Sequence, residues 1–165
     1  MKVLHISTTI EWRGGDKQLL TTYEVLKNFK DIQHVVLCPK HSVLSEKCKS
    51  IGIEYFTASR KSKFSLSFLK EIIKITRQEE IDVIHVHDSI ALSLSSLAIK
   101  FLPDVSLIYS RKRNNRIKNN YFKRVKYNNS RISNILCVSQ AVKDVLVLRF
   151  LMILKKQKSF MMELM

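Results

Sequence analysis

Two adjacent glycines follow the first apolar stretch of the chain, in the segment Glu11-Trp12-Arg13-Gly14-Gly15-Asp16. Paired glycines let backbone amides come close to a ligand, and a helix N-terminus at this point would favour a phosphate or a sugar oxygen. Trp12 and Arg13 favour binding, because an aromatic side chain beside a cation in a loop has little packing reason to be there. The alternative is that Gly14 and Gly15 only form a strand-to-helix turn, since the segment lacks the GxGxxG spacing of dinucleotide-binding loops.

A second polar group ends the apolar run Asp82–Asp88, which has the sequence DVIHVHD. His85 and His87 are two residues apart and therefore share one face of a strand. Two histidines can bind a metal, but the run offers no third ligand, so we expect no zinc site. We expect His85 to be a buried, hydrogen-bonded histidine and His87 to be functional, because His87 lies at the strand tip where side chains meet a ligand cleft. Asp88 is expected beside it in the same cleft.

The third candidate is a basic segment that begins directly after a predicted strand. Nine residues from Arg111 to Arg131 are basic, and no acidic residue occurs between Asp104 and Asp144. Interleaved aromatic residues indicate a basic amphipathic helix suited to an anionic membrane surface. The cations expected to face that membrane are Lys118, Lys123, Arg124 and Lys126. RNA or DNA binding, and a solvated basic face without a specific partner, are the alternatives. Arg111 and Lys112, directly after that strand, are expected in the cleft, where their cations could meet substrate phosphates.

Length and charge set limits on the remaining possibilities. A chain of 165 residues with 45% hydrophobic content can bury one core, so one domain is expected. Lys and Arg number 29 against 14 for Asp and Glu, and the resulting charge of +15 predicts attraction to partners that carry phosphate. The sequence contains no GxSxG, Walker lysine loop or HExxH motif, so hydrolase and kinase activities are disfavoured.

The cysteines and the apolar runs indicate where such a chain would reside. Cys38, Cys48 and Cys137 form no CxxC pair, which favours a reducing cytoplasm over a disulfide framework or a zinc site. The apolar run Val145–Leu154 is about half of the roughly 20 residues needed to cross a bilayer, and the N-terminus lacks the apolar stretch of a signal peptide. We expect a cytoplasmic protein that can associate with the inner face of the membrane.

Short β-branched runs alternate with longer segments of helical period, which predicts an α/β fold. The predicted strands are mostly apolar throughout, as strands buried on both faces should be; they are Lys2–Ser7, Gln33–Cys38, Ile53–Thr57, Asp82–His87, Val105–Ser110 and Asn134–Val138. The predicted helices are Asp16–Phe29, with Asp16 as its N-terminal cap, Ser42–Ile51, Phe64–Gln78 and Ser89–Phe101. Right-handed crossovers then give a Rossmann-like, doubly wound parallel sheet of about six strands with helices on both faces, and its ligands bind outside the carboxyl ends of the strands.

These segments together resemble the N-terminal domain of the family 4 glycosyltransferases, which are retaining enzymes of GT-B architecture. In that family a first strand leads into a Gly-Gly loop, as Val3–Gly15 does here, and a strand of the form DVIHVH ends in a histidine that His87 matches. A segment like Ile135–Asp144 closes the N-terminal domain of that family. The resemblance covers residues 1–147, which we expect to form one acceptor-side domain.

The resemblance implies transfer of a sugar from a nucleotide-sugar donor to a glycan or lipid-linked acceptor, without a metal or another cofactor, in cell-surface polysaccharide synthesis. Gly14 and Gly15 would face the phosphates of the donor, and His87, the catalytic candidate, would contact the transferred sugar. Trp12, Arg13, Asp88 and Arg111 would contact the acceptor or line the cleft. A stand-alone module that binds acceptor or membrane, and a basic nucleic-acid-binding Rossmann-like protein, are the alternatives, although nucleic acid is the less expected partner.

The last residues, 148–165, depart from the family pattern and hold four of the five methionines of the chain. One back-translation of residues 155–165, read in a shifted frame, gives K-T-K-I-I-Y-D-G-I-D, which resembles the link to the second, donor-binding domain of the family. We therefore expect this tail to be aberrant, the donor-binding domain to be lost through a frameshift, and a separately encoded donor domain to be one way of completing the enzyme.

Overall fold

The protein folds around one parallel β-sheet. A computed structural model describes residues 1–60, 62, 65–102, 104–112 and 126–150. Within this part of the chain the sheet has six strands in the order β3-β2-β1-β4-β5-β6, and every pairing is parallel. The strands are β1 (Lys2–Ile6), β2 (Gln33–Pro39), β3 (Tyr55–Ala58), β4 (Val83–Val86), β5 (Ser106–Arg111) and β6 (Ile132–Cys137). The strand order reverses between β1 and β4, so the predicted doubly wound, Rossmann-like α/β fold is confirmed.

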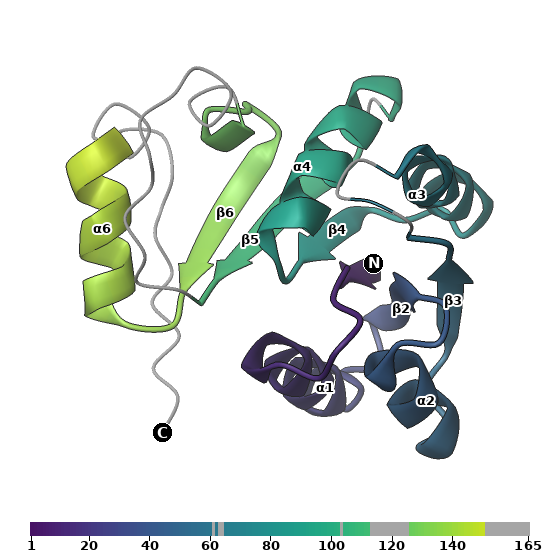
Figure 1. Ribbon diagram of the computed structural model, residues 1–165. Helices are drawn as coiled ribbons and strands as arrows, with labels where there is room; N and C mark the ends of the chain where they lie inside the picture. Colours follow the sequence, from purple (N-terminus) through teal and green to yellow (C-terminus); the bar gives the residue numbers. More distant parts are fainter. Residues whose placement is uncertain (61, 63–64, 103, 113–125, 151–165) are drawn as a thin grey trace.

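Helices cover both faces of this sheet (Figure 1). On one face lie α1 (Gly14–Leu26) and α2 (Val43–Ser50), and on the other lie α3 (Leu66–Gln78) and α4 (Ser89–Ala98). A short 3-10 helix, η1 (Ile99–Phe101), continues α4, and α6 (Gln140–Phe150) contacts β6. The predicted domain boundary at residue 147 falls inside α6, and residues 151–165 of the expected aberrant tail lie outside the described part of the chain.

Two helices differ from their predicted form. The helix α1 begins at Gly14 and ends at Leu26, so Asp16 is its third residue, not its cap, and Phe29 lies beyond it with 55% of its surface exposed. In α3, Leu66 is 70% exposed, whereas Phe68 is fully buried. At about 100° per residue, the buried stripe of α3 is centred on the Phe68 side of the helix, and Leu66 points roughly 110° away from it. The helix therefore begins at Leu66, two residues after the predicted start, and buries Phe68, Leu69, Ile72 and Ile75 against the core.

The core has two parts, one on each face of the sheet. Beneath α1 and α2, the side chains of Leu19, Val36, Leu44 and Cys48 pack together, and a larger cluster that includes Leu4, Phe68, Ile72 and Leu92 lies beneath α3 and α4. Cys38, Cys48 and Cys137 are buried free thiols. Among the described residues, no helix combines the length and apolarity that crossing a membrane requires.

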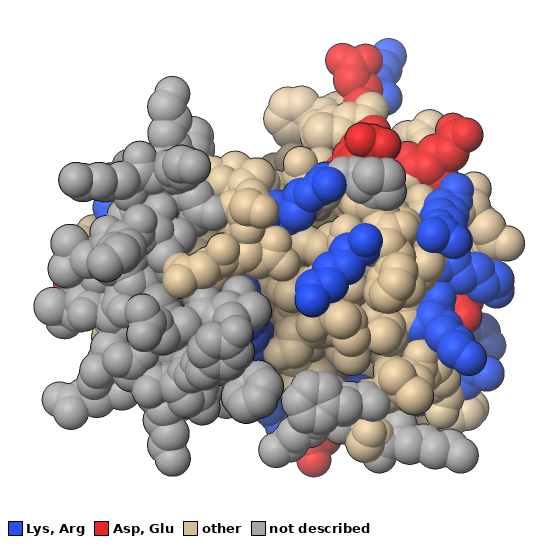
Figure 2. All heavy atoms as spheres, turned by 90° about the horizontal axis from the view of Figure 1, so that it is seen from above, with Lys and Arg blue, Asp and Glu red and all other residues tan. Residues whose placement is uncertain are grey.

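The surplus of basic side chains is spread over the surface. In Figure 2, which looks down from above the view of Figure 1, lysines and arginines lie along one edge and near the middle of the visible face, and acidic side chains lie at its upper margin. These charges are not gathered into one continuous patch on the described part of that face. Local contacts, not the net charge alone, must therefore select a ligand.

Candidate functional site

The carboxyl ends of β1, β4 and β5 open into a cleft of about 960 Å³. Its wall contains Gly14 and Gly15 at the start of α1, His87 and Asp88 after β4, and Ser110, Arg111 and Lys112 at the end of β5. Arg13, Arg60 and Lys126 add further cations. The fold thus brings together most of the site residues predicted from sequence at the edge of the sheet where ligands of doubly wound folds bind.

One wall of the cleft is the loop from β1 to α1, which the carboxylate of Asp16 holds in place. Asp16 is only 1% exposed. Its Oδ1 accepts hydrogen bonds from the hydroxyls of Ser7 at 2.6 Å and Thr9 at 2.8 Å, and its Oδ2 accepts one from the backbone amide of Arg13 at 3.0 Å. The guanidinium of Arg13 has no acceptor atom, so the usual reciprocal bond of a capping box cannot form. Asp16 therefore fixes the course of the loop that presents Gly14 and Gly15.

The start of α1 suits an anion. The first amides of a helix have no partner within it, and the helix dipole is positive at that end. A methyl group added to Gly15 would lie 3.6 Å from both the carbonyl oxygen of His87 and the Nζ atom of Lys112, whereas one added to Gly14 would meet nothing within 4 Å. Gly15 is thus the glycine whose backbone packs closely against His87 and Lys112 in the cleft wall.

Asp88 lines the cleft, but its oxygens are already engaged. Its Oδ1 accepts hydrogen bonds from the amides of Ile90 at 2.8 Å and Ala91 at 2.9 Å, so Asp88 is the N-cap of α4. It also accepts from the amide and the hydroxyl of Thr8, at 2.6 Å and 2.7 Å. Asp88 thus lies in the cleft wall as predicted, and it also ties the end of β1 to the start of α4.

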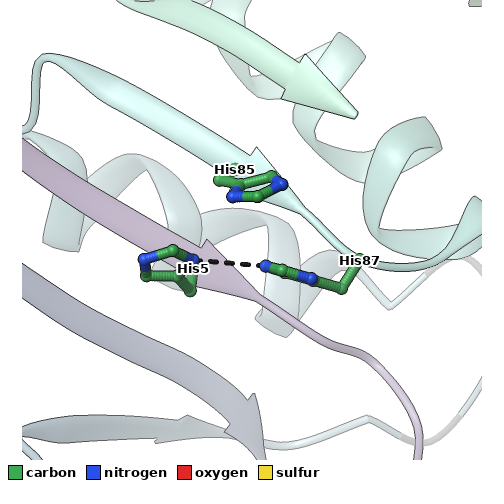
Figure 3. A group of neighbouring side chains, drawn as sticks. All are labelled: His5, His85 and His87. Carbon is green, nitrogen blue, oxygen red and sulfur yellow. Dashed lines mark hydrogen bonds between the residues drawn. The ribbon is translucent and has the colours of Figure 1, made fainter. Parts of the chain in front are cut away.

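A group of buried histidines, of which only His87 lines the cleft, is shown in Figure 3. His5 from β1 and His85 from β4 are register partners, and His87 follows β4 directly. The Nδ1 atom of His5 lies 3.2 Å from the Nε2 atom of His87, and the Nε2 atom of His85 lies 2.8 Å from the hydroxyl of Ser110. The prediction that His85 is a buried, hydrogen-bonded histidine is confirmed, and His87 is also buried, with 5% of its surface exposed.

Burial keeps these imidazoles neutral. The pKa of His85 falls to about 3, mainly because the ring is buried and in smaller part because the Lys112 cation is nearby. Burial also lowers the pKa of His5 and of His87 well below the ordinary value, with His85 as the next cause in both cases. A neutral imidazole donates a hydrogen bond at one nitrogen and accepts one at the other.

The same three histidines could serve as metal ligands. One nitrogen from each of His5, His85 and His87 lies within 4.8 Å of the others, so the fold supplies the third ligand that the sequence pattern did not indicate. Neutral imidazole is the form that binds zinc and similar ions. In the structure, however, two of the rings satisfy each other through the 3.2 Å contact between His5 and His87.

Lys112 closes the histidine group on the cleft side. Its Nζ atom donates to the carbonyl oxygen of Gly15 at 2.8 Å and lies 3.2 Å from the Nδ1 atom of His87. Burial lowers the pKa of Lys112 to about 8, although Asp16 and Asp88 act in the opposite direction. At pH 7 the ammonium is still the major form, so the cleft carries a positive charge beside the start of α1.

The basic segment contributes to the cleft in a way that was not predicted. Lys126, expected to face a membrane, is half-buried, and its Nζ atom donates to the carbonyl oxygen of Ser89 and to the hydroxyl of Ser89 at 2.9 Å. Arg111 is in the cleft wall as expected but is 95% buried and donates to the hydroxyl of Tyr127 at 3.2 Å. The other three membrane candidates, Lys118, Lys123 and Arg124, lie outside the described residues.

Trp12 is separated from the cleft. It lines a second hollow of about 470 Å³ between α1 and α2, together with Leu20, Val25 and Ile51. The ammonium of Lys47 lies 4.6 Å from the centre of its ring, a distance typical of a cation–π contact. Its two neighbours Glu11 and Arg13 both line the cleft, and their side chains form a weak, exposed ion pair at 3.7 Å. Adjacent positions in the loop thus serve different hollows.

The sequence model of Glycosyltransferase Family 4 matches residues 12–152, and so takes in the glycine pair, His87 and Lys112. This chain belongs to glycosyltransferase family 4. A search of curated proteins finds no match. The family membership agrees with the resemblance inferred from the order of the sequence motifs.

Solved structures share the fold of this family 4 chain at low sequence identity. HepE from Anabaena, solved with UDP and glucose, is 16% identical and superposes with a TM-score of 0.66 over 98% of this chain and 44% of its own. A glycosyltransferase from Rickettsia africae is 14% identical, with a TM-score of 0.74 over 97% of this chain and 42% of its own. MurG from Acinetobacter baumannii is 11% identical, with a TM-score of 0.61 over 83% and 41%. The chain therefore spans less than half the length of these proteins.

Sequence reasoning placed Lys112 at the cleft but missed three other residues of this family 4 site, which are His5, His34 and Arg60. His5 and His34 interrupt apolar strands, and a polar residue inside a fully buried strand is a signal that it needs a partner. Arg60 lies two residues after the end of β3, at the sheet edge where the cleft was expected. This position could have pointed to Arg60, whereas the contact between His5 and His34 depends on strand pairing that sequence alone does not give.

Proposed function

We propose that this chain forms the acceptor-side half of a retaining glycosyltransferase. It would transfer a sugar from a nucleotide-sugar donor to a hydroxyl of a glycan or lipid-linked acceptor in cell-surface polysaccharide synthesis. Membership of family 4 supports the class of reaction. The cleft at the carboxyl edge of the sheet is the proposed location of the transfer, because a helix N-terminus, a buried histidine and a lysine meet there.

The meeting of Gly15, His87 and Lys112 carries this proposal. The Nζ atom of Lys112 lies within hydrogen-bond distance of both the carbonyl oxygen of Gly15 and the ring of His87. When the bond between sugar and phosphate breaks, negative charge grows on the departing nucleotide. Fixed dipoles at the start of α1 and the ammonium of Lys112 would stabilise that charge, while His87 contacts the sugar.

Transfer at this cleft would need no metal or other cofactor. Divalent ions usually neutralise diphosphate charge in enzymes that depend on them. Here Lys112, Arg13 and Arg60 already supply positive charge to the cleft. UDP is the first nucleotide to test, because HepE was solved with UDP and with UDP-glucose, and MnaA from S. aureus was solved with UDP.

We also propose that the protein works in the cytoplasm, at the inner face of the membrane, where lipid-linked acceptors would be within reach. The net charge of +15 supports attraction to anionic lipid. A second domain, encoded with this one or separately, would grip the donor. Nucleic acid is not among the proposed partners.

A transfer assay tests the proposal. The chain would be joined to the donor-binding domain of a family 4 relative and supplied with UDP-glucose and candidate acceptors, with release of UDP as the signal. His87→Asn should lower kcat/KM about 10- to 1000-fold if His87 contacts the reacting sugar. His41→Asn is the matched control, because His41 is exposed, has a φ of 57° that asparagine tolerates, and lies outside the cleft wall. Equal activity of the two variants would reject the assigned role of His87.

A further inference from the structure

Four side chains form a continuous line from the cleft into the domain. The Nζ atom of Lys112 is 3.2 Å from Nδ1 of His87, Nε2 of His87 is 3.2 Å from Nδ1 of His5, and Nε2 of His5 is 3.3 Å from Nδ1 of His34. All three histidines are at least 94% buried. His34 and His5 lie in the neighbouring strands β2 and β1, and His87 directly follows β4, the next strand of the sheet.

The chemistry of lysine gives this line a direction. An ammonium can only donate, so Nδ1 of His87 must carry a lone pair and its proton must be on Nε2. That proton is donated to Nδ1 of His5, which places the proton of His5 on Nε2 and directs it to Nδ1 of His34. Each neutral ring is therefore expected in the same tautomer, with its proton on Nε2.

The far end of the line agrees with this direction. The Nε2 atom of His34 has no hydrogen-bond partner of normal geometry among the described residues. The backbone carbonyl of Leu26, in the last turn of α1, nevertheless favours a proton on His34. With Nδ1 of His34 engaged by His5, Nε2 is the nitrogen left to carry that proton, as the direction set by Lys112 requires.

We infer that Lys112, His87, His5 and His34 form one directed hydrogen-bond chain, in which His5 and His34 are positioning residues that hold His87 as a hydrogen-bond acceptor toward the cleft. The identity of the ligand in this inference rests on the proposed function. A group that replaces Lys112 at Nδ1 of His87 must donate a hydrogen bond, so a sugar hydroxyl fits there and a phosphate oxygen does not. The released ammonium of Lys112 is then available to the phosphate.

Histidine NMR tests the direction of the chain without any ligand. The full chain, labelled with nitrogen-15 in its imidazoles, is studied by long-range proton–nitrogen correlation, which distinguishes the two tautomers. His5, His34 and His87 should all carry the proton on Nε2. A proton on Nδ1 of His87, or a cationic ring at neutral pH, overturns the inference.

Substitutions at Lys112 test whether this residue sets the direction of the hydrogen-bond chain. Lys112→Arg keeps a donor and should preserve the tautomer of His87, whereas Lys112→Met should leave His87 exchanging between both tautomers. Lys100→Met, at an exposed position away from the cleft, is the control and should leave the histidine signals unchanged. If Lys112→Met and Lys112→Arg give the same His87 tautomer as the native chain, Lys112 does not set it and the inference fails.

Two additions complete the test. UDP-glucose should shift the Nδ1 signal of His87 but keep its proton on Nε2, because a sugar hydroxyl replaces the ammonium as donor, whereas UDP alone should draw Lys112 to its phosphate and leave His87 exchanging between both tautomers. The same His87 signals with UDP and with UDP-glucose would overturn the assignment of a hydroxyl to Nδ1. Stoichiometric binding of Co²⁺ by His5, His85 and His87, seen as a visible absorption band that His5→Gln abolishes, would replace the hydrogen-bond chain with a metal site. A correct tautomer pattern in a chain that shows no transfer would reject the proposed function alone.

Discussion

The carboxylate of Asp88 holds Thr8 through two hydrogen bonds, one from its backbone amide at 2.6 Å and one from its hydroxyl at 2.7 Å. The same carboxylate accepts from two amides in the first turn of α4. Asp88 therefore connects the ends of two adjacent strands, β1 and β4, at the edge where the cleft opens. The geometry of the cleft depends on this connection as well as on the residues that face a ligand.

Replacing Asp88 with alanine should destabilise the domain more than the loss of an ordinary helix cap. Four donors would lose their acceptor, which we expect to cost about 2–4 kcal/mol in the free energy of unfolding. Ser65→Ala is the comparison, because the hydroxyl of Ser65 accepts from a single helix amide, that of Phe68, and otherwise bonds Ser59 and Ser67 nearby, so its loss should cost about 1 kcal/mol. Urea unfolding measures both values. Equal losses would show that Asp88 acts as a cap and nothing more.

Asp16→Ala should also lower stability by about 2–4 kcal/mol, because the change leaves the hydroxyls of Ser7 and Thr9 and the amide of Arg13 without their buried acceptor. Glu24→Ala is the matched acidic control on the same helix. Glu24 is exposed and forms a surface ion pair with Lys27, so its removal should change the free energy of unfolding by less than about 0.5 kcal/mol. A small effect of Asp16→Ala in urea unfolding would mean that the loop does not rely on this carboxylate.

The buried histidines predict a loss of stability in mild acid. Their pKa values are lower in the folded protein than in the unfolded chain, where histidine has a pKa near 6.5, so the unfolded chain binds more protons below that pH. The free energy of unfolding should therefore fall as the pH drops from 6.5 toward 4. Each of His5, His85 and His87 should contribute up to about 1.4 kcal/mol per pH unit.

Denaturant unfolding at a series of pH values checks this slope. His85→Gln removes one buried imidazole while keeping a group that can bond Ser110, and it should make the slope shallower by the share of one histidine. His41→Asn, at an exposed position, should leave the slope unchanged. Identical slopes for the native chain and His85→Gln would show that His85 is not held neutral by burial.

Trp12 offers a spectroscopic prediction, since it is the single tryptophan of the chain. Lys47 lies over its ring, and the ring is 37% exposed. Lys47→Met should change the emission of Trp12, and a nucleotide sugar that binds in the cleft should leave that emission unaltered, because Trp12 lines the separate hollow between α1 and α2. A marked change in emission on addition of UDP-glucose would instead place Trp12 at the ligand.

The parallel sheet was predictable because strands buried on both faces form apolar runs, as in β4 and β5, and because each run is followed by a segment of helical period. His87 could be placed at the sheet edge for the same reason. The bonds of Asp16 to Ser7 and of Asp88 to Thr8 could not be predicted, since they go to residues on other elements. Lys126 was expected to face a membrane because of its basic surroundings, whereas its Nζ atom contacts Ser89 in α4, 37 residues away in sequence. The sequence pattern predicts where a side chain lies along its helix or strand. Its hydrogen-bond partners on other helices and strands are known only from the three-dimensional structure.

The most direct test of the central claim is to titrate the nitrogen-15-labelled chain with UDP-glucose at millimolar concentration and follow its backbone amides. If the cleft at the carboxyl edge is the transfer site, the amides of Gly14, Gly15 and His87 should shift together, and Lys112→Met should weaken the response. Shifts confined to the hollow around Trp12, or no shift at Gly15 and His87, would contradict the account.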